Sequence, residues 1–275
     1  TKAANAFGGA IYLVVPGKCD LGKVDVTIGG ALDAPRYVLG QTKNEDWIKT
    51  IRQHPGPWAE LETSKVILTV PAADIRALEN PEELMKTWDD VMDAVADLAG
   101  IPRERPRPER YVADVQISAG FMHSGYPIMM HLKEAGPAVD KQWLLTKTEP
   151  SWGYFHEMGH NHQAGDWTFD GTTEVTCNLF TRYVMDKVCG TPLLKQRGLA
   201  NGDSAKLLRR HLAGGKDFAK WKADPFLALY MYDQLQLAFG WDAFKKVFAE
   251  YRQLPKDQRP KNDDEERDQW MVRFS

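Results

Sequence analysis

The sequence His156-Glu157-Met158-Gly159-His160 carries two histidines separated by one helical turn. On a helix both imidazoles point from the same face, so both can reach a single Zn²⁺ while Glu157 flanks the open position of the metal. The pattern predicts a metal-binding helix over about residues 151–162. A site of this kind can hydrolyse an amide bond.

The surroundings of this motif favour a metal site over a surface helix with two solvated histidines. Unpaired histidines would be costly in an apolar setting, so a partly buried helix argues for a bound ion. The apolar neighbours that predict such burial are Trp152, Tyr154, Phe155 and Met158.

Several residues compete to be the third metal ligand. Asp166 stands six residues after His160, where one class of zinc proteases has its last ligand, but that class needs a glycine where Gln163 stands. His162 lies about 200° around the helix from His160 and should face away from the metal. Asp170 is a weaker loop candidate.

Glu174 is the favoured third ligand. Gly171-Thr172-Thr173 can begin a new helix, which places Glu174 in its first turn. Asn178 follows one turn later and can accept the free N–H of a zinc-bound histidine. The sequence therefore predicts a site of His156, His160 and Glu174 with Asn178 behind it.

Composition and charge predict a soluble globule with a sizeable core. The 275 residues are 43% hydrophobic, and the formal net charge is only −3, which disfavours nucleic acid as a partner. No apolar run approaches the ~20 residues that span a bilayer. The three cysteines, Cys19, Cys177 and Cys189, form no C-x-x-C pair, which leaves one disulfide plus a free thiol as a possibility.

Periodicity predicts an α+β chain with a β-rich part over about 1–131 and an α-rich part over about 141–275. An antiparallel sheet is expected to lie beside the metal-binding helix. The expected strands are 10–15, 23–28, 65–70, 111–117 and 126–131. The expected helices, besides that at 151–162, are 81–98, 173–188, 226–239, 241–251 and 264–274.

The segment from Phe155 to Gln163, followed by Trp167 and by Glu174-Val175-Thr176-Cys177-Asn178-Leu179, resembles the enhancin-like metallopeptidases, peptidase family M60. Their pattern is H-E-x-G-H, a later Trp, and E-V-x-x-N-L. Similarity extends to Phe7–Tyr12, to Asp114–Ile117 with Met122–Ile128, and to the ending near Trp270–Ser275. The resemblance implies one zincin-like catalytic domain over 1–275, with one Zn²⁺ per chain and a glutamate third ligand. It also implies a secreted or cell-surface enzyme, often acting on O-glycosylated, mucin-like proteins.

The expected reaction is peptide hydrolysis by metal-activated water with Glu157 as general base. His123 or Tyr126 can donate to the oxyanion, although a satisfied core histidine and a packed tyrosine are equally compatible with the sequence. Extended substrate can pair with an edge at Gly8-Gly9 or at 123–128, since glycine permits close backbone approach. For a sugar-bearing substrate the candidate contacts are Trp167, Asp166 and Phe121, with core packing favoured for Trp167.

Two other functions fit the same residues. One is a secreted zinc protease without a glycan requirement. The other is a glycan-binding or interaction domain that keeps the fold but has lost hydrolysis. The intact Glu157 argues against the second, because an acid beside the metal has little structural purpose.

Overall fold

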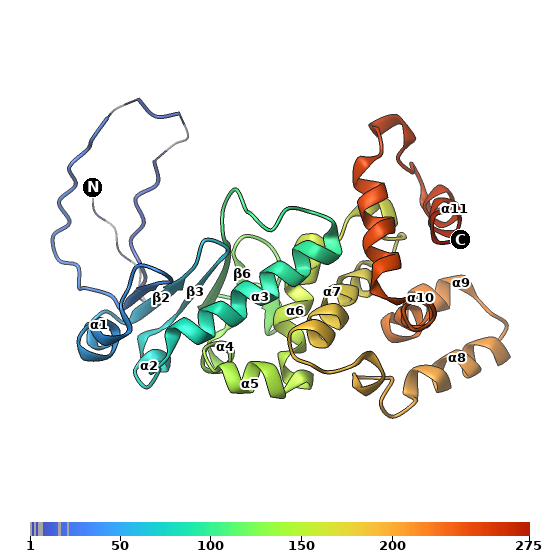
Figure 1. Ribbon diagram of the computed structural model, residues 1–275, viewed down its shortest axis with the longest axis horizontal. Coiled ribbons are helices and arrows are strands. Elements are labelled where there is room, and N and C mark those ends of the chain that lie inside the picture. The colour runs from blue at the N-terminus through green and yellow to red at the C-terminus, as the bar shows by residue number, and fades with distance from the viewer. Residues whose placement is uncertain (1, 3, 5–7, 16–17, 21) are drawn as a thin grey trace.

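The computed structural model describes residues 2, 4, 8–15, 18–20 and 22–275 (Figure 1). Phe7, which belongs to the resemblance noted above, lies outside them. The strands are β1 (Arg36–Val38), β2 (Trp58–Glu62), β3 (Val66–Pro71), β4 (Glu109–Asp114), β5 (Met122–His123) and β6 (Ile128–His131). The α-helices are α1 (Asn44–Lys49), α2 (Ala72–Ile75), α3 (Pro81–Ala99), α4 (Ala135–Ala138), α5 (Lys141–Thr146), α6 (Thr148–His162), α7 (Thr173–Lys187), α8 (Asp203–Ala213), α9 (Phe218–Lys222), α10 (Pro225–Gln253) and α11 (Asp263–Phe274). Short 3-10 helices are η1 (Ile51–Gln53), η2 (Leu132–Glu134), η3 (Gly165–Trp167), η4 (Leu193–Lys195) and η5 (Lys256–Gln258).

The chain is α+β, with a mixed sheet followed by a mainly helical half. In the described part of the chain the strands form one six-stranded sheet in the order β1-β2-β3-β4-β6-β5. The expectation of a mainly antiparallel sheet was wrong, because β1–β2, β3–β4 and β4–β6 are parallel pairs. For β3 and β4 the reason is α3, which connects them as a crossover and so brings β4 back in the same direction.

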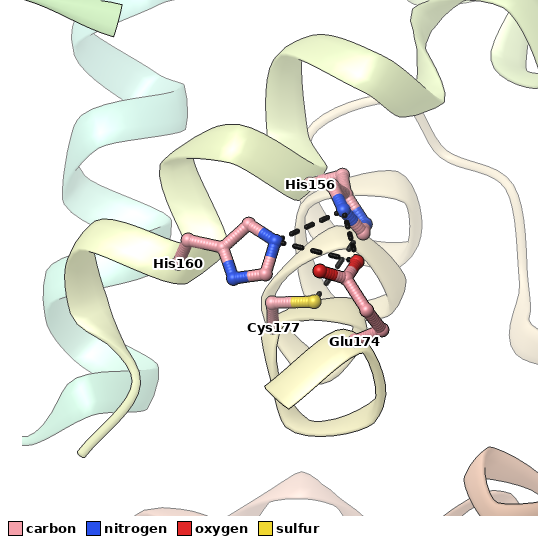
Figure 2. A group of neighbouring side chains, drawn as sticks. All are labelled: His156, His160, Glu174 and Cys177. Atoms are coloured by element: carbon pink, nitrogen blue, oxygen red, sulfur yellow. Dashed lines mark hydrogen bonds and ion pairs between the residues drawn. The ribbon is translucent and has the colours of Figure 1, made fainter. Parts of the chain in front are cut away.

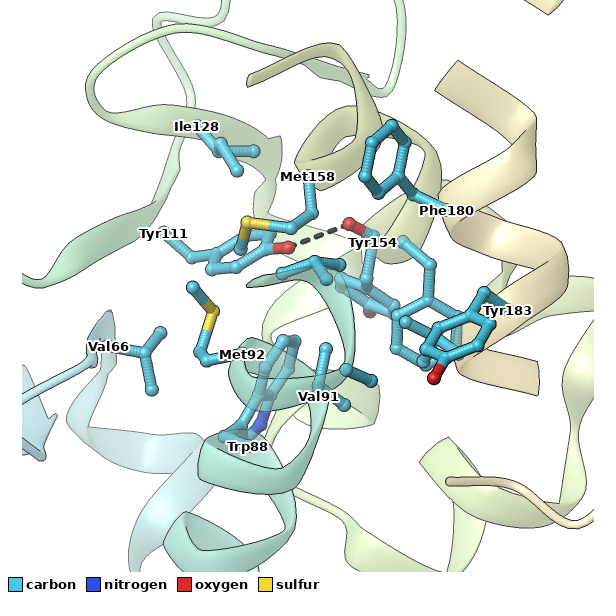
Figure 3. Close-up of a cluster of buried hydrophobic side chains, with 14 of the residues drawn as sticks. Val66, Trp88, Val91, Met92, Tyr111, Ile128, Tyr154, Met158, Phe180 and Tyr183 are labelled. Atoms are coloured by element: carbon cyan, nitrogen blue, oxygen red, sulfur yellow. Dashed lines mark hydrogen bonds between the residues drawn. The ribbon is translucent and has the colours of Figure 1, made fainter. Parts of the chain in front are cut away.

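Helix α3 covers one face of the sheet and forms the core with it (Figure 3). Its buried residues recur at helical spacing, as the sequence predicted, and include Trp88 and Met92. Asn80 caps its N-terminus by accepting a hydrogen bond from Glu83 N–H, and Gly100 ends it in the left-handed conformation. Across the core, the Tyr111 hydroxyl of β4 donates to the carbonyl oxygen of Tyr154 in α6 at 2.7 Å. This contact fixes the metal-motif helix against the sheet.

The two N-terminal strand predictions, 10–15 and 23–28, were wrong. Both segments lie outside the sheet without strand structure, in the loop that extends away from the body of the molecule (Figure 1). Their apolar side chains are exposed, for example Val14 at 86% and Val24 at 62%. The alternation of apolar residues is present, but in the described residues no neighbouring strand pairs with it.

The helical half agrees with the predicted elements and places two helices side by side. Helix α6 packs along α7 over most of its length, and α10 packs on the other side of α7. The two helices predicted at 226–239 and 241–251 run on as α10, interrupted at Gly240, whose φ of 76° is non-helical. In the part of the chain that is described, no helix combines the length and apolar character that a bilayer crossing requires.

Candidate metal centre

Helices α6 and α7 bring the three predicted metal ligands together (Figure 2). His156 and His160 extend from one face of α6, and their Nε2 atoms are 3.1 Å apart. Glu174, in the first turn of α7, places its Oε2 atom 3.1 Å from His156 Nε2 and 3.5 Å from His160 Nε2. The structure thus joins residues from two helices at one point.

The spacing of these three atoms fits a tetrahedral zinc ion. Zinc bonds to histidine nitrogen and carboxylate oxygen are about 2.0–2.2 Å long, so ligand atoms at tetrahedral angles lie about 3.3 Å apart. The observed separations of 3.1 to 3.5 Å match that value. Three protein ligands of this kind leave a fourth position for water or substrate.

Each histidine has a polar partner on its second ring nitrogen. The Asn178 Oδ1 atom accepts a hydrogen bond from His156 Nδ1 at 2.8 Å, and Asn178 Nδ2 donates to the carbonyl oxygen of Glu174. The Gln163 amide lies 2.9 Å from His160 Nδ1 and is itself joined to Thr176 Oγ1 at 2.7 Å. Because the Asn178 oxygen accepts from His156 Nδ1–H, it fixes this tautomer and leaves the Nε2 lone pair of His156 available to a metal. At His160 the partner is the Gln163 Nε2 atom, a donor, so Nδ1 accepts there. Sequence reasoning identified Asn178 but gave Gln163 no such role.

The acid of the motif, Glu157, lies beside the group on the sheet-facing side of α6. Burial raises its pKa and the negative charge of Glu174 adds to that rise, whereas His156 and a backbone hydrogen bond from Ser124 oppose it. Burial also lowers the pKa of His160, and the neighbouring His156 lowers it further. A neutral imidazole is the form that binds a metal.

Cys177 joins the same cluster, which the sequence analysis did not anticipate. It stands three residues after Glu174, on the same side of α7, and its Sγ atom is 3.6 Å from His156 Nδ1. Since Nδ1 already faces Asn178, the thiol lies behind the imidazole, away from its metal-facing nitrogen. Burial raises the pKa of this thiol well above its usual range, which keeps it protonated. In the described residues all three cysteines are free thiols, so the possible disulfide is not formed.

His123, Tyr126 and Phe121 lie on or next to β5, the last strand of the sheet. His123 Nδ1 contacts Ser124 O at 2.9 Å. Tyr126 is half-exposed and stacks under Arg107, whose Cζ lies 3.6 Å from the ring centre. Phe121 is 67% exposed. These three candidates are therefore near the metal-motif helix and accessible.

The other candidates lie elsewhere. Asp166 forms an ion pair with Arg259 at 3.0 Å, and Trp167 is fully buried and stacked on Phe248 of α10. Trp167 is thus a core residue, as the sequence favoured. Gly8 lies against Pro57 and Trp58 beside β2, far across the sheet from β5, and Gly9 has no strand partner. The structure does not bring these residues to the metal group. His162 also faces away, buried against Arg105.

A protein-family model described as "Peptidase M60, enhancin and enhancin-like" matches residues 30–275. Among curated proteins, TRPM8 channel-associated factor 2 of Bos taurus is 44% identical over 99% of this chain, and TRPM8 channel-associated factor 1 of Homo sapiens is 46% identical over 90%. The matched regions are 29% and 26% of those proteins. The chain therefore spans less than a third of the curated relatives it matches.

Solved structures share the fold at low sequence identity. A functionally unknown conserved protein from Bacillus anthracis has a TM-score of 0.74 at 24% identity, over 88% of this chain and 50% of that one. The ZmpB metallopeptidase from Clostridium perfringens has a TM-score of 0.63 at 17% identity, with the same coverage of 88% and 50%. The ZmpC catalytic domain from that organism, in complex with the sialyl T antigen, gives 0.56 at 14%, again over 88% and 50%.

Proposed function

The chain belongs to the peptidase M60, enhancin and enhancin-like family, and from that premise we propose that it is a zinc-dependent endopeptidase. His156, His160 and Glu174 would hold the ion, and Glu157 would act as the general base. The observation that carries the proposal is the convergence of two Nε2 atoms and one carboxylate oxygen within 3.1 to 3.5 Å of one another, with a partly buried acid alongside.

The zinc ion and Glu157 have separate roles in the proposed reaction. A zinc ion at this position supplies a Lewis acid that polarises the scissile carbonyl and lowers the pKa of a water molecule towards about 7. Glu157 takes the proton from that water as it attacks and passes it to the leaving amine.

The free edge of β5 offers a place for an extended substrate. The Phe121 carbonyl accepts a hydrogen bond from His131 N–H in β6, so the backbone groups of Met122, the next residue, face the opposite side. That side also carries Ser124, whose backbone faces the Glu157 carboxyl. A peptide added to this edge would lie beside the general base.

We propose O-glycosylated, mucin-like proteins as the substrate class and a secreted or cell-surface setting. The support is the ZmpC relative, whose structure is in complex with the sialyl T antigen, and the exposure of aromatic side chains beside β5. Phe121 is 67% and Tyr126 44% exposed, and such rings can stack on sugar faces. A secreted zinc protease without a glycan requirement is the runner-up.

Cleavage of an O-glycosylated peptide and of the same peptide without its sugar tests both readings. Cleavage of the glycosylated form alone supports the glycan requirement, and equal rates on both support the runner-up. Glu157→Gln is the control, because it keeps the shape of the side chain but cannot accept the proton. If this variant cleaves as fast as the wild type, Glu157 is not the base and the mechanism is wrong.

A non-catalytic interaction domain is the candidate from a different class. It is favoured by the curated relatives, which are named as channel-associated factors rather than as peptidases. On this reading the wild-type chain binds zinc but cleaves none of a panel of glycosylated and bare peptides. Zinc stoichiometry and cleavage, measured on the same preparation, separate the two functions.

A further inference from the structure

The segment Met122–Gly125 lies against helix α6 at three of its residues, Gly153, Glu157 and Asn161. A side chain at Gly153 would place its Cβ 3.0 Å from Met122 Sδ, so the sulfur rests on that glycine. The Ser124 backbone faces the Glu157 carboxyl and opposes the rise of its pKa, and the Gly125 backbone hydrogen-bonds to the Asn161 side chain. Residues 153, 157 and 161 are each four apart and form one stripe along the helix. The metal-binding histidines occupy the adjacent stripe.

Asn161 makes the strongest of these attachments. Its Oδ1 accepts from the backbone N–H of Gly125 at 3.1 Å, and its Nδ2 donates to the carbonyl oxygen of the same residue at 2.9 Å. The side-chain amide thus pairs with Gly125 as a neighbouring strand would. Gly125 has a φ of 125°, a conformation that residues with a side chain rarely adopt, so the pairing holds a backbone shape that needs glycine.

The orientation of the Asn161 amide is determined by a second acceptor. Nδ2 also lies 3.3 Å from Glu109 Oε2 in β4. Arg105 holds Glu109 at 3.5 Å and reaches His162 Nε2 at 3.0 Å. With two oxygens facing it, this end of the side chain must be the NH₂ group.

We propose that Asn161 is a positioning residue, which fixes the edge strand β5 and the Ser124–Gly125 turn relative to Glu157 and so sets how well substrate binds. This rests on the proposed peptidase function. Asn161 does not touch the metal-facing atoms of the histidines; it acts through the Gly125 backbone. Its loss should free the turn while the zinc ligands stay in place.

Asn161→Ala tests the proposal through two independent measurements. Amide hydrogen exchange at residues 122–126 of the zinc-free protein should become about tenfold faster, because two hydrogen bonds are lost. For peptide cleavage, KM should rise by about tenfold while kcat and zinc stoichiometry change little. Asn201→Ala is the matched control: its side chain bonds to Asp203 at the start of α8, and its loss should change neither.

Asn161→Asp tests whether Asn161 positions the Ser124–Gly125 turn through its hydrogen bonds or only fills space. The carboxylate has nearly the same shape but faces the oxygens of Gly125 and Glu109, so exchange should exceed that of the alanine variant. Adding Glu109→Gln removes one of the repelling charges and should restore part of the protection. A merely structural role predicts instead that each variant loses stability globally, with exchange raised equally in α3 and α7.

Different results would overturn the positioning role of Asn161 and the peptidase function. Unchanged exchange at residues 122–126 and an unchanged KM in Asn161→Ala would overturn the positioning role. An inactive wild type would overturn the peptidase function, and in that case the exchange measurement alone decides whether Asn161 holds the turn.

Discussion

Gly159 of α6 lies directly against the backbone of Cys177 in α7: a Cβ on Gly159 would come 2.1 Å from the Cys177 carbonyl oxygen. No side chain fits at that distance. The contact lets the two helices approach closely enough for Glu174 to reach the histidines. It also explains in physical terms why the fourth position of the metal motif is glycine.

We expect Gly159→Ala to lower the free energy of unfolding by about 2 kcal/mol or more, because the added methyl group meets rigid backbone. Zinc affinity should fall as well, since α7 must move away. Urea denaturation and a zinc titration measure the two effects. Gly165→Ala is the matched control, with nothing within 4 Å of its Cβ position and no positive φ. Equal stability of the two variants would contradict the close-contact explanation.

Asn178→Leu should weaken zinc binding by about 10- to 100-fold, because the His156 imidazole loses the acceptor that orients it. Leucine is similar in size, so the buried site remains filled. Competition with a chromophoric chelator gives the affinity directly. An unchanged dissociation constant would mean that the hydrogen bond does not orient the ligand.

Removing zinc with a chelator should abolish peptide cleavage without unfolding the chain. The core is built on the sheet, α3 and the faces of α6 and α7 away from the metal, and it does not depend on the ion. Circular dichroism before and after chelation should be the same, and added zinc should restore cleavage. Loss of helical signal on chelation would show that the metal contributes to the fold itself.

Arg182 and Asp233 form a fully buried ion pair at 3.0 Å between α7 and α10. Asp233→Ala should cost about 3–5 kcal/mol of folding stability, because it leaves the guanidinium buried without its charge partner. The double variant Arg182→Met, Asp233→Leu replaces both charges with apolar groups and should recover most of the loss. Denaturant unfolding of Arg182→Met, of Asp233→Leu and of the double variant measures the coupling. Strictly additive losses of folding stability would argue against coupling between Arg182 and Asp233.

The sequence predicted those features that rest on local periodicity. Helix α3 was recognisable because its buried side chains recur with the helical period and a glycine ends it. The mixed sheet was not recognisable from the sequence, because strand direction depends on how each connection returns the chain, as α3 does between β3 and β4. The apolar alternation at 23–28 was misread as a paired strand, since periodicity records a strand-like pattern but not whether a partner is present.

The candidate site was predictable in its ligands but not in its surroundings. Spacing on a helix is enough to place His156 and His160 together, and a helix start after Gly171 suggested Glu174. The pairing of Asn161 with Gly125 joins residues 36 positions apart. Such contacts depend on the tertiary packing of β5 against α6, which no local pattern in the sequence encodes.

The three ligands differ sharply in their access to solvent. The side chain of Glu174 is 61% exposed, against 18% for His156 and 11% for His160. A metal ion that enters from solvent would therefore meet the Glu174 carboxylate before it meets the more buried histidine nitrogens.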